Sequence, residues 1–423
     1  MKPYEQAART VEYKTLTLPS GLTVLIRPMP GYSAVHAIYA TKFGAIDRDF
    51  KVDGKEVHLP AGVAHFLEHK MFESEDGDAF AKYAKTGANA NAYTGFDRTA
   101  YIFTASSKID ESLDVLLGMV GNPYFTPQTI QKEQGIIGQE IKMYDDSVDW
   151  RLMMAMFQSM YEKHPLRDDI AGSVESIAQI TPEMLYDCCK AFYRPENMVL
   201  ALAGNITEKQ VMDACRRAGL DKPSAPVKVE RLMPEESALP WRREYEISMP
   251  IVQTGFGLAF KEQSVEKGNL KREIIYDLLP DLICGGMTPL YRRLYDEGLV
   301  NPEFDGETLM VDGAACVLFT GESNQCDRVL ELLREEIQRI KTQGVEEELF
   351  TLVKNQLYGE AIVDMESVVD AASSMASAHQ HGRTLYDGIR TLAALTKEDV
   401  DRELATMLDP DTSVVVKVQP QKP

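Results

Sequence analysis

Residues 62–72 read Gly-Val-Ala-His-Phe-Leu-Glu-His-Lys-Met-Phe and contain a five-residue H-x-x-E-H run from His65 to His69. The two histidines are four residues apart, so on a helix their side chains share one face and can reach one metal ion. Glu68 lies one turn beyond His65 and points to nearly the same side. Neutral imidazoles bind zinc, and a nearby carboxylate can act as a base toward a water molecule at the metal. This order of residues is the inverse of the H-E-x-x-H run found in many zinc peptidases.

A catalytic zinc ion usually has three protein ligands, so another carboxylate is expected from elsewhere in the chain. A helix is predicted to begin at Pro127, since proline suits the first helical position. Glu133 and Glu140 lie seven residues apart on this helix and therefore share one face. Gly135 and Gly138 are poor helix formers, and we expect them to allow close approach of the helix that carries the histidines.

Three motifs together resemble the pitrilysin/insulysin family of zinc metallopeptidases, which includes mitochondrial processing peptidase and small bacterial members. They are the run at 62–72, the segment Gly-Ala-Asn-Ala-Asn-Ala-Tyr-Thr at 87–94, and the E-x6-E pair at Glu133 and Glu140. The family motif places the second pair some seventy residues after the first. Here the gap from His69 to Glu140 is 71 residues (140 − 69).

The resemblance implies a role for each of these residues. It implies that His65, His69 and Glu140 bind one zinc ion per chain. Glu68 would be the catalytic base, and Glu133 a second catalytic-site residue that supports the ligands from outside. The resemblance further implies that Asn91 and Ala92 lie near an edge strand that pairs with the substrate backbone. A peptide substrate would be read there mainly through its backbone, by strand addition.

Active single-subunit members of the family carry an arginine and a tyrosine, about six residues apart, in the second half of the chain. The corresponding positions here are Tyr295 and Asn301. One alternative is that a nearby arginine substitutes: Arg292, one turn earlier on nearly the same face, is favoured over Arg293. The other alternative, which we favour, is that a homologous partner subunit supplies the pair. A heterodimer is then favoured over a homodimer.

The order of expected elements repeats after about 200 residues, which indicates two similar α+β domains. In the first half we predict strands at 16–18, 22–26, 34–40, 99–104 and 198–203, and helices at 109–120, 127–144 and 181–192. In the second half we predict strands at 251–256, 315–320 and 414–418, and helices at 326–342, 346–364, from about 272 and from about 396. Pro280 is expected to kink or end the helix that begins near Arg272.

Proline and charged residues gather at 218–240, which suits a linker. The predicted organisation is a zinc-bearing catalytic domain at 1–217, a linker at 218–240, and a homologous domain without a metal site at 241–423. The resemblance implies that each domain is a mostly antiparallel sheet with helices packed on one face. It also implies that the chain is half of a clamshell whose chamber needs a second chain to close.

The net charge is −20 and no basic stretch offsets it, so nucleic-acid binding is not expected. The acidic residues either keep the surface soluble or attract cationic peptides to an acidic interior. No run of eighteen apolar residues indicates a membrane span, and the first residues do not match a secretion signal. Six cysteines without a C-x-x-C pattern indicate reduced thiols, so we expect a cytoplasmic location. The resemblance to the small bacterial members of the family implies that this cytoplasm is bacterial.

The predicted function is therefore that of a zinc metalloendopeptidase subunit that cleaves short or unfolded peptides inside a chamber. The alternative is a non-catalytic peptide-binding or assembly subunit of the same fold. Scaffold members of the family usually lose the zinc motif, so its presence here favours the enzyme.

Overall fold

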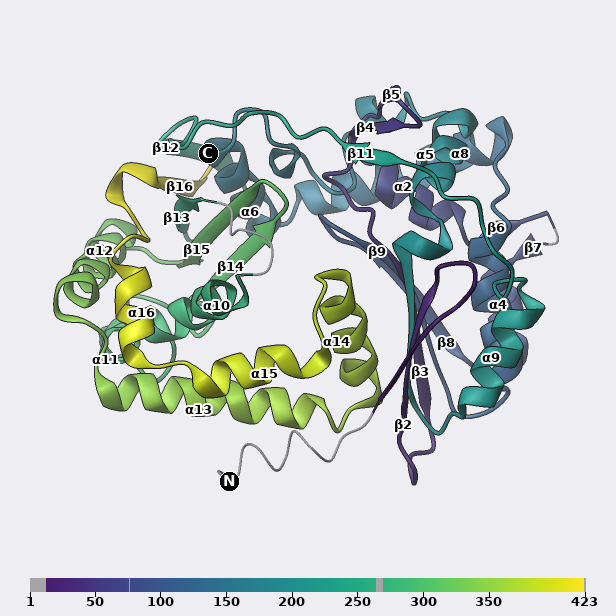
Figure 1. Cartoon of the computed structure of the whole chain (residues 1–423). Coiled ribbons are helices and arrows are strands. Elements are labelled where there is room, and N and C mark those ends of the chain that lie inside the picture. The colour runs from purple at the N-terminus through teal and green to yellow at the C-terminus, as the bar shows by residue number, and fades with distance from the viewer. Residues whose placement is uncertain (1–12, 76, 264–268, 422–423) are drawn as a thin grey trace. The chain divides into compact units, whose positions relative to one another are not determined.

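The computed structural model describes residues 13–75, 77–263 and 269–421 (Figure 1). The chain forms two compact units, and each unit is built from three segments. The first unit comprises Met1–Ile141, Asp169–Leu232 and Ile362–Tyr386. The second comprises Lys142–Asp168, Met233–Ala361 and Asp387–Pro423. The contiguous domain limits expected from the sequence stay a prediction, and the structure adds that each unit includes a segment from the other half of the chain.

The first unit contains a six-stranded sheet in the order β1-β2-β10-β3-β9-β8. Only β2 and β10 pair in parallel, so the sheet is mostly antiparallel, as predicted. The central strands β3 and β10 are buried at every residue, whereas the edge strand β8 alternates between exposed and half-buried side chains. The strands are β1 (Lys14–Thr17), β2 (Thr23–Pro28), β3 (Val35–Thr41), β8 (Asn89–Thr94), β9 (Thr99–Ala105) and β10 (Met198–Gly204).

One face of this sheet shares a hydrophobic core with the helices that surround it. Val35, Ala37 and Tyr39 of β3 contribute to this core. The helices are α2 (Val63–Lys70), α3 (Ala79–Thr86), α4 (Ile109–Gly121), α5 (Pro127–Asp145), α8 (Pro182–Phe192) and α9 (Glu208–Arg217). The opposite face contacts α14 (Val368–Gln380), a helix from the second half of the chain. A small separate sheet pairs β4 (Asp49–Val52) with β5 (Lys55–His58) and with β11 (Val229–Arg231), which lies inside the predicted linker.

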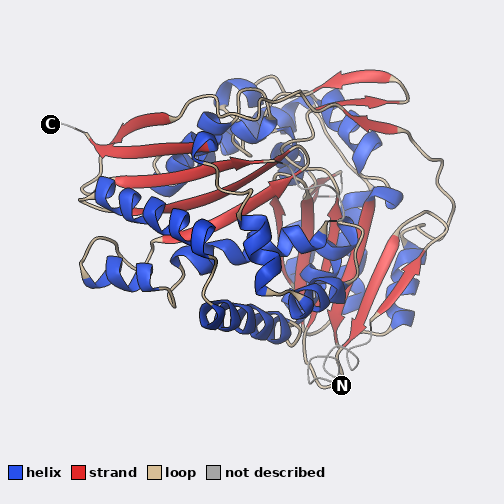
Figure 2. Ribbon diagram, turned by 60° about the vertical axis from the view of Figure 1, so that its left-hand side comes forward, coloured by secondary structure: helices blue, strands red, loops and turns tan. Residues whose placement is uncertain are grey.

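The second unit contains a five-stranded sheet in the order β12-β16-β13-β15-β14. Figure 2 draws the strands of the chain in red and its helices in blue. The helix-covered face of this sheet forms a second hydrophobic core, and the sheet also contacts α6 (Val148–Met160), a helix from the first half of the chain. The strands are β12 (Glu244–Met249), β13 (Gly255–Glu262), β14 (Asp305–Val311), β15 (Ala314–Glu322) and β16 (Ser413–Pro420). The helices are α10 (Leu270–Cys284), α11 (Pro289–Asp296), α12 (Cys326–Gln343), α13 (Glu347–Asp364), α15 (Leu385–Ala394) and α16 (Lys397–Leu404).

The two sheets have matching topology, which confirms the predicted two-domain α+β class. In each sheet one parallel pair, β2–β10 or β12–β16, is followed by three strands in antiparallel order. The predicted helix starts also match, because Thr181 and Thr396 both accept a hydrogen bond from the first turn of α8 and α16. Each of these helices leads into the parallel-paired strand of its sheet.

Two predictions for the second half are wrong. The strand expected at 251–256 begins only at Gly255, and the strand before it, β12, was not predicted. The helix α10 continues through Pro280 to Cys284, so the expectation that it ends there is wrong, while the alternative of a kink stays a prediction. The surrounding residues Leu278, Leu279, Leu282 and Ile283 have no exposed surface. Burial of these side chains offsets the loss of about 3 kcal/mol that an interior proline causes.

The expected role of Gly135 and Gly138 is also wrong. A Cβ atom added at either position would meet no atom within 4 Å. Gly135 is exposed on α5. These glycines are therefore not needed for close helix packing, and the structure gives no other reason for them. No described helix is both long enough and apolar enough to cross a membrane.

Candidate metal centre

The helix α2 begins at a glycine whose backbone only glycine adopts easily. Gly62 has a φ of 91°, and a Cβ there would lie 2.5 Å from the Ala171 carbonyl oxygen. This residue therefore fixes where the chain enters the helix. From there α2 is buried along almost its whole length, including His65 and Glu68. Burial of these polar side chains requires partners, and those partners define the site.

We expect Gly62→Ala to destabilise the protein by about 2–4 kcal/mol, since the left-handed backbone and the steric clash act together. The measurement is urea-induced unfolding, compared with Gly54→Ala. Gly54 also has a positive φ, of 86°, but a Cβ there meets no atom within 4 Å. Equal destabilisation by the two substitutions would show that the contact with Ala171 does not matter.

Three side chains from two helices converge, and they are the three that the family resemblance implies as zinc ligands; their role as ligands stays a prediction. The Nε2 atoms of His65 and His69, on α2, each lie 3.6 Å from a carboxylate oxygen of Glu140, on α5. One ligand atom from each of the three residues lies within 4.8 Å of the other two. In the described part of the chain, this is the group of histidine, cysteine, aspartate and glutamate side chains that could hold a metal ion.

The separations fit a tetrahedral zinc ion. With metal–ligand bonds of about 2.0–2.1 Å, two tetrahedral ligand atoms are about 3.3 Å apart. The two observed distances of 3.6 Å end on different oxygens of Glu140, and the three ligand atoms lie within 4.8 Å of one another, so the side chains would have to close slightly to reach this spacing. Two imidazoles and one carboxylate are also a known donor set for catalytic zinc, with the fourth position left for water or substrate.

The two histidines have different surroundings. The Nδ1 atom of His69 lies 3.0 Å from Glu133, a contact that orients the ring with Nε2 toward Glu140. Burial lowers the pKa of His69, but the hydrogen bond with Glu133 and the nearby carboxylates Glu68, Glu133 and Glu140 raise it overall. Burial and the adjacent His69 lower the pKa of His65 to about 3. His65 is therefore held as a neutral imidazole, which is the form that binds metal.

Glu68 is held by a residue to which the sequence analysis gave no role. Its Oε2 atom accepts a hydrogen bond of 2.8 Å from the hydroxyl of Thr94, the last residue of β8. Burial raises the pKa of Glu68, while the Thr94 hydrogen bond and His69 oppose that rise. Thr94 follows Ala92 by two residues, so the strand period places both on one face. The two-residue spacing from Ala92 was therefore the feature of the sequence that could have identified Thr94 as a site residue.

Asn91 and Ala92 lie on β8, which is the edge strand of its sheet. The Ala92 N–H donates to the side-chain oxygen of its own neighbour Asn91, at 2.9 Å. Because β8 has one strand neighbour, β9, in the described part of the chain, its other edge can accept an added strand. The geometry is therefore compatible with the predicted role, which stays a prediction.

Arg292 and Arg293 both lie on α11 in the second unit. Each side chain pairs with a carboxylate four residues later: Arg292 with Asp296 at 2.6 Å and Arg293 with Glu297 at 2.9 Å. Tyr295 is half-exposed, and the Asn301 amide lies 3.4 Å from Glu322. A role for either arginine in substrate binding stays a prediction.

We expect Thr94→Val to lower kcat about 10-fold with zinc content unchanged, because loss of the hydrogen bond lets the Glu68 carboxylate move out of position. Steady-state peptide cleavage and zinc analysis of the same sample provide the measurement. Thr94→Ser keeps the hydroxyl and should retain most of the activity. If serine and valine behave alike, the hydrogen bond has no positioning role.

This geometry defines a class of protein: a two-unit α+β fold with an inverted H-x-x-E-H helix and a His-His-Glu cluster suited to a divalent metal. Residues 56–174 match the family model described as insulinase, peptidase family M16. Residues 179–357 match the model described as the peptidase M16 inactive domain. The uncharacterized zinc protease YmfH of Bacillus subtilis is 34% identical over 426 residues, covering 99% of this chain and 98% of its own length.

Comparison with a solved structure indicates the same family. The "putative M16-like peptidase from Alicyclobacillus acidocaldarius" superposes with a TM-score of 0.94 at 32% identity, covering 97% of this chain and 99% of that one. The "Probable mitochondrial-processing peptidase subunit beta, mitochondrial" of Arabidopsis thaliana is 28% identical over 54% of this chain and 42% of its own length. The chain belongs to peptidase family M16, which confirms the resemblance to the pitrilysin/insulysin proteins. The H-x-x-E-H run lies in the segment matched by the insulinase model.

Proposed function

We propose that this chain is the zinc-bearing subunit of a metalloendopeptidase. The observation that supports the proposal best is the convergence of His65, His69 and Glu140, with Glu68 buried beside them and not among the three clustered side chains. A bound zinc ion would polarise the scissile carbonyl and make a water molecule more acidic. The names of the relatives, zinc protease and mitochondrial-processing peptidase, agree with this chemistry.

Each side chain then has a defined task. His65, His69 and Glu140 hold the metal, and Glu133 orients the His69 ring through Nδ1. Glu68 accepts a proton from the attacking water and later gives it to the leaving amine. The raised pKa of Glu68 suits this double task, since a base that must also act as an acid works best with a pKa near the operating pH.

The substrate is proposed to be a short or unfolded peptide that adds as a strand to the free edge of β8. Asn91 and Ala92 would meet its backbone there, and Thr94 of the same strand holds Glu68. Only an extended chain can pair in this way, so a folded protein would be excluded. Enclosure in a chamber formed with a second chain would add selection by size.

We propose that the partner is a homologous subunit that carries the missing arginine and tyrosine. The positions expected for them hold Tyr295 and Asn301. The nearby Arg292 and Arg293 are already paired with acidic side chains four residues later in the chain. The pair would bind the substrate from the partner, so two different chains would form one active assembly.

Peptide cleavage by the purified chain, alone and mixed with a homologous chain that carries the Arg/Tyr segment, tests this division of roles. We expect the mixture to cleave at least about 10-fold faster than either chain alone, because the two halves of the site lie on different subunits. Equal rates for this chain alone and for the mixture would contradict the partner proposal. They would leave the zinc chemistry intact.

The second candidate, a non-catalytic peptide-binding subunit, has one observation in its favour: the match of residues 179–357 to the inactive M16 domain. That match ends before α14 and does not include the metal cluster. It covers residues 241–357 of the domain for which no metal site was expected, and also residues 179–217 of the predicted zinc-bearing domain, which contain none of the three clustered side chains.

A further inference from the structure

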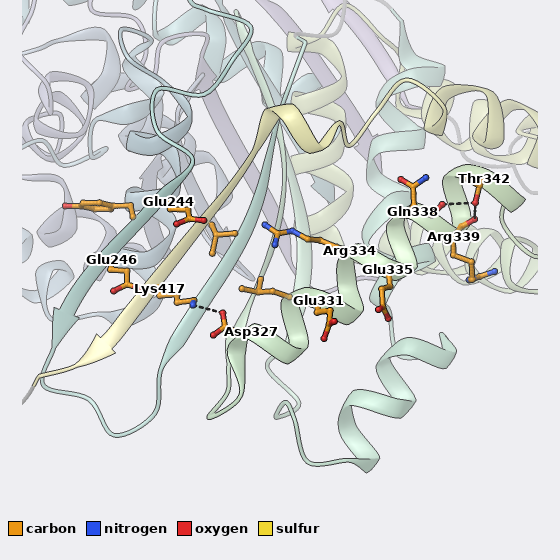
Figure 3. A pocket seen from close by; sticks show the side chains of 13 residues that line it. Glu244, Glu246, Asp327, Glu331, Arg334, Glu335, Gln338, Arg339, Thr342 and Lys417 are labelled. Carbon is orange, nitrogen blue, oxygen red and sulfur yellow. Dashed lines mark hydrogen bonds and ion pairs between the residues drawn. The ribbon is translucent and has the colours of Figure 1, made fainter.

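A groove of about 980 Å³ lies on the second unit, between α12 and the strands β12 and β16 (Figure 3). Its strand side is formed by Glu244, Tyr245, Glu246, Val415 and Lys417, and its helix side by α12 from Asp327 to Thr342. Figure 3 shows the Arg334 side chain reaching from α12 toward the strands. The lining holds five acidic and three basic side chains, a net charge of −2 (3 − 5).

The first unit shows what occupies the matching position there. The helix α4 follows β9 just as α12 follows β15, and the two helices share a burial pattern. Counted from the first residue of each helix, the fifth and eighth positions are Leu113 and Leu116 in α4. They are Leu330 and Leu333 in α12, and all four are buried.

On α4 the neighbouring helix is α9. The two helices pack together, and the α9 residues Val211, Ala214 and Cys215 are buried in the core of the first unit. At the rim of the contact, the Arg217 guanidinium of α9 lies 2.8 Å from Asp114 of α4. The Gln210 amide also donates to Asp110, at 3.3 Å.

The acidic positions that receive α9 are repeated on α12. Asp110 and Asp114 are the second and sixth residues of α4, and Asp327 and Glu331 are the second and sixth residues of α12. In the described part of the second unit no helix follows β16 to cover them. Asp327 instead pairs with Lys417 at 2.7 Å, and Glu331 pairs with Arg328 of its own helix.

The strand side differs between the units. In the first unit the parallel pair β2 and β10 contributes the apolar side chains Val24, Ile26 and Leu202 to the hydrophobic core, and all three are fully buried. The groove of the second unit instead presents Glu244, Glu246 and Lys417. Charged side chains are stable in contact with water, so this surface does not need a helix to cover it. A helix that binds in the groove can therefore dissociate again. The excess of negative charge favours an occupant with positive charge.

We propose that this groove is a docking site for a short cationic amphipathic helix of another protein, seated on α12 as α9 is seated on α4. An arginine or lysine in its last turn would pair with Glu331, as Arg217 pairs with Asp114. A few apolar side chains would contact Val415, a half-buried apolar residue of the lining. The site requires neither the metal nor catalysis, so it goes beyond the proposed peptidase function.

The test uses a peptide of residues 205–219 of this chain, the α9 segment, as the probe. A lactam bridge between its Lys209 and Asp213 side chains would hold it helical, since these already form an ion pair of 2.7 Å on the exposed face of α9. Fluorescence anisotropy with the full-length protein measures binding. We expect Glu331→Lys to weaken binding at least about 10-fold, and Glu303→Lys, an exposed residue outside the groove, to change it less than about 2-fold.

A charge swap makes the test specific. A peptide with Arg216→Glu and Arg217→Glu should bind the native protein weakly and regain affinity for the Glu331→Lys variant. Equal binding of the original peptide to the native and Glu331→Lys proteins would overturn the proposal. So would the absence of saturable binding at about millimolar peptide. Self-association of the native chain that Glu331→Lys abolishes would show that the occupant is a second copy, which also contradicts the proposal.

Discussion

Replacing Glu68 with glutamine is expected to lower peptide cleavage by about 10²–10⁴-fold while zinc stays bound. Glutamine keeps the shape of the side chain and can still contact Thr94 Oγ1, which lies 2.8 Å from the carboxylate in the native protein. It cannot accept the proton of the attacking water. The loss should therefore fall on kcat, with KM little changed.

The control for this experiment is zinc content measured on the same samples. A Glu68→Gln protein with full zinc and no activity identifies the side chain as the base. A variant that remains fully active would end the peptidase proposal as stated here. Glu133→Gln gives a graded comparison, since Glu133 contacts His69 at 3.0 Å and is placed to act only through that ring.

The second large effect concerns the metal. We expect His65→Ala to weaken zinc binding by more than about 100-fold, because loss of a residue that merely supports a ligand already costs about 10–100-fold. Elemental analysis after gel filtration should give one zinc per native chain and almost none per variant. His69→Ala and Glu140→Ala should behave in the same way, since all three side chains belong to one cluster.

His58→Ala serves as the matched control, because His58 is an exposed histidine outside the cluster. Its zinc content should equal that of the native chain. Zinc should also raise the unfolding temperature of the native protein and of His58→Ala, but not that of His65→Ala, since a ligand stabilises only the state that binds it. Full zinc in His65→Ala would contradict the ligand assignment.

Features set by local sequence were predictable. The spacing of His65 and His69 places both on one face of α2, and the seven-residue spacing of Glu133 and Glu140 does the same on α5. Thr181 and Thr396 mark helix starts because a threonine side chain caps the first turn wherever the helix lies. The convergence of α2 and α5 needed the family resemblance, since spacing alone does not bring two helices together.

Features that depend on distant contacts were missed. The helices α6 and α14 each pack on the sheet that is formed mainly by the other half of the chain, and no local pattern reveals such an exchange. Pro280 was expected to kink or end its helix, but the helix does not end there, because burial of the neighbouring side chains maintains it. Gly135 and Gly138 were given a packing role that their open surroundings do not support.

The central claim is that two imidazoles and one carboxylate, from α2 and α5, hold a single metal ion. Diffraction from zinc-loaded crystals, recorded on both sides of the zinc absorption edge, tests it most directly. The account predicts one strong anomalous peak about 2.0–2.2 Å from His65 Nε2, His69 Nε2 and a Glu140 oxygen. A peak elsewhere, or a fully zinc-loaded crystal in which Glu140 does not touch the ion, would contradict it.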